Sequence, residues 1–168
     1  MIDKIVAATE RALRAVAEPR FWRTERGFQG RFYCALQQVL DSEGLLPDGR
    51  ILEMEYQKGW CRHGMRQRPD IVLHIPTEES NAAPYENNFA VWALKRAATL
   101  TEASDDFEKL DQMFDRLRYP VGVFVNIAAT NHFADAYNGR FPRRLRTVAA
   151  SRAADRIVTA WGVPKAAA

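Results

Sequence analysis

Cysteine and histidine are scarce in this chain of 168 residues. Its two cysteines, Cys34 and Cys61, cannot form the disulfide framework of a small secreted domain, so we expect two reduced thiols. The three histidines, His63, His74 and His132, are scattered along the sequence, and Cys61 has no second pair of ligands at zinc-site spacing. The sequence therefore predicts no zinc site.

Membrane spans and secretion signals are also missing. No apolar run approaches the roughly 18 residues that a spanning helix needs. The N-terminal segment is interrupted by charged residues, so it lacks the apolar core of a signal peptide; these residues are Asp3, Lys4, Glu10 and Arg11. There is no Gly-x-Ser-x-Gly elbow and no glycine-rich phosphate loop. We therefore expect a soluble, cytoplasmic protein.

The composition is that of an ordinary globular protein, with 47% hydrophobic and 27% charged residues. The length suits one domain with its own hydrophobic core. We divide it into an N-terminal helical extension (1–23), a core (24–127) and a C-terminal helical part (128–168). The formal net charge of +3 suits an anionic partner such as nucleic acid without proving one.

Hydrophobic periodicity predicts a mixed α/β protein. The helical period is found over residues 2–17, 24–40 and 105–117, and a last helix is expected over 151–161. Thr24 and Ser104 are suitable N-caps for the second and third helices. Four segments predict strands, namely 51–57, 69–75, 89–96 and 121–127.

Three polar residues occupy suggestive places in this order. Asp70 opens the second strand directly after a proline, Lys95 lies near the end of the third strand, and Glu25 lies in the first turn of a helix. Carboxylates suit a hard cation such as magnesium, and a nearby lysine can orient water or stabilise phosphate charge. Plainer interpretations also exist: a strand start, an exposed lysine, and an acid favoured by the helix dipole.

These residues and their order resemble the PD-(D/E)XK phosphodiesterases, the superfamily of the restriction endonucleases and junction resolvases. The dipeptide Pro69-Asp70 and the strand 91–96 carry the resemblance, as do Glu25 with Gln29 and the segment 105–110 with its Lys-Leu pair. The resemblance implies a restriction endonuclease-like core, α-β-β-β-α-β, whose mixed central sheet is flanked by helices. It also implies Mg²⁺ or Mn²⁺ held by Glu25 and Asp70, with Lys95 as the catalytic cation.

Position 93, where that family keeps its second acid, holds alanine. Residues 93 and 95 share one face of a strand, so an immediate neighbour cannot replace the carboxylate. Either Ala93 replaces a natural glutamate, or the acid has been lost or moved to Glu53, Glu55 or Glu86. With Ala93 we expect activity to be abolished or strongly reduced.

Basic residues gather in two groups that could contact nucleic acid, although such groups are often simply solvated. The first precedes Asp70 and consists of Arg62, Arg66 and Arg68. The second, with Tyr137 and Phe141 interleaved, consists of Arg140, Arg143, Arg144 and Arg146. Asp105 and Asp106 are interpreted as acids that stabilise a helix start.

The sequence thus favours a metal-dependent nuclease that hydrolyses DNA, with RNA left open and a homodimer possible. The alternative is a non-catalytic module with a nuclease fold that binds nucleic acid or a protein partner. A third interpretation is an unrelated α/β domain, in which Asp70 and Lys95 would not meet in space.

Overall fold

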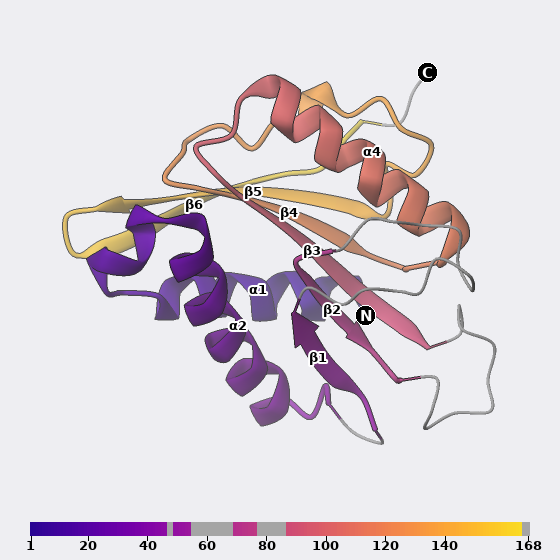
Figure 1. Cartoon of the computed structure of the whole chain (residues 1–168), viewed down its shortest axis with the longest axis horizontal. Helices are drawn as coiled ribbons and strands as arrows, with labels where there is room; N and C mark the ends of the chain where they lie inside the picture. Colours follow the sequence, from indigo (N-terminus) through magenta and orange to yellow (C-terminus); the bar gives the residue numbers. More distant parts are fainter. Residues whose placement is uncertain (47–48, 55–68, 77–86, 166–168) are drawn as a thin grey trace.

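The chain folds around one six-stranded mixed sheet in the order β1-β2-β3-β4-β5-β6 (Figure 1). This computed structural model describes residues 1–46, 49–54, 69–76 and 87–165. The strands are β1 (Ile51–Met54), β2 (Ile71–His74), β3 (Asn88–Arg96), β4 (Gly122–Ile127), β5 (Leu145–Ala153) and β6 (Arg156–Gly162). The helices are α1 (Ile2–Ala15), α2 (Glu25–Ser42) and α4 (Leu100–Arg116), with short 3₁₀ turns η1 (Pro19–Arg23) and η3 (Ala134–Ala136).

Helices cover both faces of the sheet. In Figure 1, α1 and α2 lie on one face and α4 lies on the other. Alternation along β3 divides its side chains between two cores: Trp92 and Leu94 pack with α1 and α2, whereas Val91 packs with α4. Strands β3, β4 and β5 are parallel to one another, and the remaining neighbours are antiparallel. Central strands buried on both faces explain the continuous apolar run in β4.

The predicted mixed α/β architecture is confirmed, and so are its first two helices. Thr24 caps α2 as expected, because its hydroxyl accepts a hydrogen bond from the Gly27 amide at 3.1 Å. Strands occur in each of the four predicted segments, although residues 55–57 of the first lie outside the described part. Elements from α2 to β4 follow the predicted order α-β-β-β-α-β among the described residues. Within the same part, no helix has the length and apolarity needed to span a membrane.

The predicted C-terminal helix is wrong. Residues 151–161 belong to β5 and β6, an antiparallel hairpin that turns at Ala154 with a φ of 54°. The alanines of this segment favour a helix, but Ile157, Val158 and Thr159 are β-branched. Pairing of β5 with β6 decides between them, because it holds residues 151–161 in the sheet, and β5 is itself anchored on β4 through residues 145–150.

The third helix begins earlier than predicted. It starts at Leu100 rather than at residue 105, and Thr99 rather than Ser104 is its N-cap. Thr99 and Glu102 form a capping box, in which each side chain bonds the backbone amide of the other residue. Two amides are satisfied at once, which explains why the helix starts here.

Candidate active site

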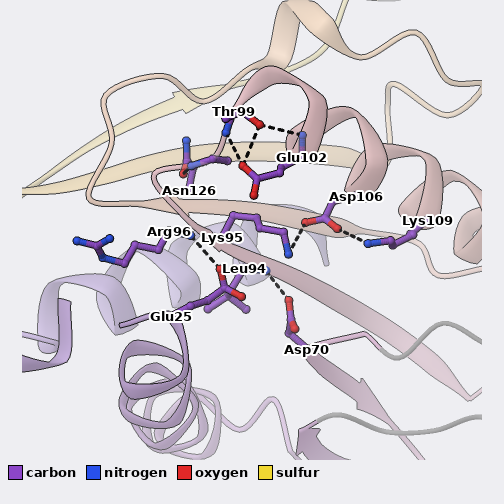
Figure 2. Close-up of polar contacts among 11 residues, drawn as sticks. Glu25, Asp70, Leu94, Lys95, Arg96, Thr99, Glu102, Asp106, Lys109 and Asn126 are labelled. Carbon is purple, nitrogen blue, oxygen red and sulfur yellow. Dashed lines mark hydrogen bonds and ion pairs between the residues drawn. The ribbon is translucent and has the colours of Figure 1, made fainter. Parts of the chain in front are cut away.

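Asp70 lies immediately before β2 and is held through both its side chain and its backbone. Its Oδ2 accepts a hydrogen bond from the backbone amide of Leu94 on β3, at 2.6 Å (Figure 2). Its carbonyl accepts a bond from Gln29 Nε2 on α2, at 3.2 Å. Gln29, part of the family pattern in the sequence, therefore positions Asp70 rather than lining the site.

Lys95 and Asp106 meet on the α4 face of the sheet. Lys95 Nζ lies 3.4 Å from Asp106 Oδ2, and Lys109 Nζ lies 2.8 Å from Asp106 Oδ1 (Figure 2). The residue Asp106 is only 3% exposed. Its Oδ2 is fully buried and receives no hydrogen bond from a described residue. The two ammonium groups, Lys95 at Oδ2 and Lys109 at Oδ1, compensate the charge of this buried carboxylate.

The turn between β3 and α4 places Asp106 over the sheet. Asn126 on β4 pairs with Lys95 and is buried. Its Oδ1 accepts a hydrogen bond from Ala98 in the turn, at 2.9 Å, and its Nδ2 donates to the Asn131 carbonyl. Together with the capping box at Thr99, this amide fixes the start of α4, so the second turn of the helix faces Lys95.

A pocket of about 160 Å³ connects the two acidic residues. Asp70 and Asp106 both line it, and the small side chain of Ala93 forms part of its wall between them. Its lining comprises Pro69, Asp70, Val91, Trp92, Ala93, Lys95, Asp106, Lys109, Leu110 and Met113. Two carboxylates and two ammonium groups thus face one small volume.

The charges in this pocket are strongly coupled. Burial raises the pKa of Asp70 from 3.8 to about 6, against the lowering effects of the Leu94 amide and Lys95, and Asp106 and Glu25 raise it further. Burial alone would lower the pKa of Lys95, but Asp106, Glu25 and Asp70 together raise it. Lys95 is therefore a cation at neutral pH. Asp70 is protonated at acidic pH and loses its proton as the pH rises through its pKa of about 6.

Glu25 reaches the same region without lining the pocket. Its Oε2 accepts a hydrogen bond from the Arg96 backbone amide at 3.1 Å, so it ties the start of α2 to the end of β3 (Figure 2). Its charge acts on Asp70 and Lys95, as the pKa shifts of both residues indicate. The structure thus brings the three predicted residues together, with Glu25 at the border of the site.

Of the three substitutes considered for the acid at position 93, the structure describes Glu53. Glu53 on β1 contacts His74, whose Nε2 is 3.0 Å from Glu53 Oε2, and it does not line the pocket. Glu55 and Glu86 lie outside the described residues. Ala93 does share the face of Lys95, as expected from alternation.

The two predicted basic groups differ in how far the structure describes them. Arg62, Arg66 and Arg68 lie outside the described residues. In the second group, Arg144 donates to the carbonyls of Phe114 and Tyr119, and Arg140 pairs with acidic residues of α4. None of the four arginines of the second group lines the pocket.

Sequence analysis missed Asp106, which it interpreted as an acid near a helix start. Because α4 begins at Leu100, Asp106 lies in the second turn and faces the sheet. A signal was present: Asp106 shares the helical stripe of Leu110 and Met113, so its position predicts burial. An acid on a buried stripe, three residues before Lys109, is typical of a buried ion pair or of a site.

The side chains of the pocket could supply a metal ion with one or two ligands, but not with a complete set of protein ligands. Within residues 1–46, 49–54, 69–76 and 87–165, no cluster of three or more His, Cys, Asp or Glu side chains could hold an ion. Magnesium, however, is commonly held by one or two carboxylates together with water and substrate phosphate. Asp70 and Asp106 line one pocket and are the two carboxylates that could hold such an ion there.

Comparison of the chain with models of protein families, with curated proteins and with solved structures finds no match. A function is therefore inferred from the residues of the pocket.

Proposed function

We propose that the protein is a metal-dependent phosphodiesterase that hydrolyses DNA. The observation that carries the proposal is the convergence of Asp70, Lys95 and Asp106 on one pocket. The element order α-β-β-β-α-β, with an acid before the second strand and a lysine on the third, supports the resemblance to the PD-(D/E)XK phosphodiesterases. The third interpretation, an unrelated domain, would have left Asp70 and Lys95 apart.

In this proposal Asp106 supplies the second acidic group in place of position 93. Ala93 leaves space between Asp70 and Asp106, and all three residues line the same pocket. The Oδ2 of Asp106 is buried and lies 3.4 Å from Lys95 Nζ, so an ion bound there would share this carboxylate with Lys95. Ala93 is then compatible with activity, in contrast to the loss that the sequence alone led us to expect.

Asp70 and Asp106 would hold Mg²⁺ or Mn²⁺ in this pocket. Such an ion polarises a phosphoryl oxygen and lowers the pKa of bound water. Glu25 acts as a positioning residue, since its carboxylate holds the Arg96 amide and raises the pKa of Lys95.

Lys95 stabilises charge and does not act as a general base. Burial opposes its charge, but the neighbouring carboxylates keep its pKa above the ordinary value, so the amine carries no free lone pair at neutral pH. An ammonium in a small, partly buried pocket can donate hydrogen bonds to a non-bridging phosphate oxygen as charge develops there. Activity should increase as Asp70 ionises, above a pH of about 6.

The test is cleavage of plasmid and single-stranded DNA with Mg²⁺ or Mn²⁺ by four proteins: the chain itself, Asp106→Asn, Asp105→Asn and Ala93→Glu. Asp105 is an exposed acid on the same helix, so Asp105→Asn is the matched control. We expect the unaltered chain and Asp105→Asn to cut, and chelator to stop both. Asp106→Asn should lose at least about a hundredfold in rate, as when a charge-stabilising group is removed.

Two outcomes would redirect the proposal. If only Ala93→Glu cuts, the second acid belongs at position 93 and the protein is inactive as it stands. If no variant cuts but the chain binds DNA with an affinity that falls as salt increases, the non-catalytic module is the better description.

A further inference from the structure

Exposed arginines gather where η1 leads into α2. Residues 19–31 contain four arginines and one acidic residue, Glu25. Arg96, at the end of β3, adds a fifth exposed guanidinium. We call this set the arginine surface, and it consists of Arg20, Arg23, Arg26, Arg31 and Arg96. No ion pair among the described residues includes any of these five.

Three other arginines of the described part do form ion pairs, whereas the exposed Arg143 and Arg156 form none with a described residue. Arg11 pairs with Glu43, Arg14 pairs with Glu10, and Arg140 pairs with two acidic residues of α4. Guanidinium groups that are left unpaired by carboxylates, close together and exposed, repel one another at low salt. An anionic partner relieves that repulsion and is the ligand such a surface favours.

Hydrogen bonds join the arginine surface to the pocket. Arg96 Nε donates to the Trp22 carbonyl in η1 at 2.9 Å, and its backbone amide donates to Glu25. Gln29 holds the Asp70 carbonyl, and Arg26 lies three residues before it, on the adjoining part of the helix. Gln29 and Glu25 therefore connect α2, the helix that carries Arg26 and Arg31, to Asp70 and to the end of β3.

The η1 backbone beneath the arginine surface is anchored by the buried side chain of Trp22. Trp22 is 6% exposed, and its indole Nε1 donates to the Val16 carbonyl at 2.7 Å. Its ring also packs edge to face against Phe28, with centroids 4.8 Å apart. A fixed backbone reduces the ordering cost that binding imposes on a charged surface.

Helix α4 carries the opposite charge. Its sequence contains six acidic and two basic residues, and Asp105 and Glu108 are exposed. Helix α4 forms one wall of the pocket, and α2 lies on the opposite face of the sheet (Figure 1), where Gln29 holds the Asp70 carbonyl. The acidic helix α4 repels phosphate, whereas the arginine surface attracts it. A polyanion is therefore steered toward the pocket from the side of η1 and α2.

We infer that the DNA strand enters the pocket across the arginine surface, with successive backbone phosphates on Arg26, Arg23 and Arg96. This inference rests on the proposed function, since it gives the path of that substrate. It also replaces the role predicted for Arg143 and Arg144, because Arg144 is already bound to two backbone carbonyls.

The test measures binding apart from cleavage. Fluorescence anisotropy of a labelled single-stranded oligonucleotide is recorded in chelator over a range of salt concentrations. The variants are Arg23→Gln/Arg26→Gln, the charge-conserving Arg23→Lys/Arg26→Lys, and the control Arg143→Gln/Arg156→Gln. The control removes the same charge from two exposed positions outside the arginine surface.

We expect the Gln pair at 23 and 26 to weaken binding roughly tenfold or more at low salt. It should also reduce the slope of log K against log salt by about 1.4, or about 0.7 for each lost contact with a single strand. The Lys pair should keep both quantities near those of the unaltered chain, since it conserves the charge. The control should change the slope little.

Equal losses in the control and in the Gln pair would overturn the inference, because net charge alone would then explain binding. Absence of binding at low salt would overturn it as well. Failure of the proposed function has a different signature: the Gln pair still loses affinity, but no protein cuts DNA with added metal. If the Gln pair binds and cuts as well as the unaltered chain, the arginine surface is wrong and the proposed function stands.

Discussion

Replacing Asp70 with asparagine should stabilise the fold at neutral pH while it removes activity. Asparagine is similar in size, and its Oδ1 can still accept the hydrogen bond from the Leu94 amide. Only the charge is lost. In the native protein that charge is costly, because burial raises the pKa of Asp70 from 3.8 to about 6.

The size of the effect follows from the pKa. Each pKa unit corresponds to about 1.4 kcal/mol at 25 °C, so ionising Asp70 costs the folded state up to about 3 kcal/mol. The contribution of Asp70 to stability is complete below its unfolded pKa of 3.8. It is lost as the pH rises through the folded value of about 6, because the unfolded chain releases the proton first. Asp70→Asn has no such dependence.

The assay is urea unfolding, monitored by circular dichroism, at about pH 4 and about pH 8 in chelator. The free energy of unfolding of Asp70→Asn should exceed that of the native chain by about 1 to 3 kcal/mol at the higher pH. The difference should be near zero at the lower pH. The exposed Asp105→Asn variant serves as the control and should stay within about 0.5 kcal/mol of the native chain at both.

A constant difference between the two pH values would refute this reasoning. It would mean that the Asp70 carboxylate is not penalised by its surroundings, and that the pocket is more hydrated than its lining indicates. A loss of stability at both pH values would instead assign Asp70 a structural role through its contact with Leu94.

Three further predictions concern the site and its scaffold. Mg²⁺ at ten times its dissociation constant should raise the unfolding free energy of the native chain by about 1.4 kcal/mol and leave Asp70→Asn unchanged, which thermal or urea unfolding at about pH 8 would reveal. Glu10→Ala should cost about 1 to 3 kcal/mol, since the Trp161 Nε1 that donates to Glu10 at 2.9 Å loses its acceptor; urea unfolding would measure this. Gly122→Ala should cost about 1 to 3 kcal/mol in the same assay, because a Cβ would lie 2.6 Å from Cζ of the buried Phe114. Stabilities equal to that of the native chain would contradict each of these arguments.

Local sequence determined much of the framework. Helical periodicity located α1 and α2, Thr24 marked the start of α2, and the apolar run of β4 predicted a central strand. These features depend on residues a few positions apart in the sequence, so they can be predicted without knowledge of the tertiary structure. The same is true of the alternation along β3, which correctly put Ala93 and Lys95 on one face.

Predictions from local sequence were wrong where contacts between distant residues determined the secondary structure. The alanine-rich segment 151–161 has no strong preference of its own, and pairing of β5 with β6 made it part of the sheet. The start of α4 was legible in the spacing of Thr99 and Glu102, but the acids that follow suggested a later one. Because the predicted start was five residues too late, Asp106 was assigned to the first turn of the helix, and its position facing the sheet was not predicted.

The candidate site was therefore predicted in part. Sequence order identified Asp70 and Lys95, since each has a recognisable place on its strand. Asp106 became a candidate only when α4 packed on β3 and brought its carboxylate to Lys95. The contact of Glu25 with the Arg96 amide depends in the same way on packing, because it joins the start of α2 to the end of β3. Sequence determines which groups are available, whereas packing of distant elements decides which of them face the same few ångströms of space.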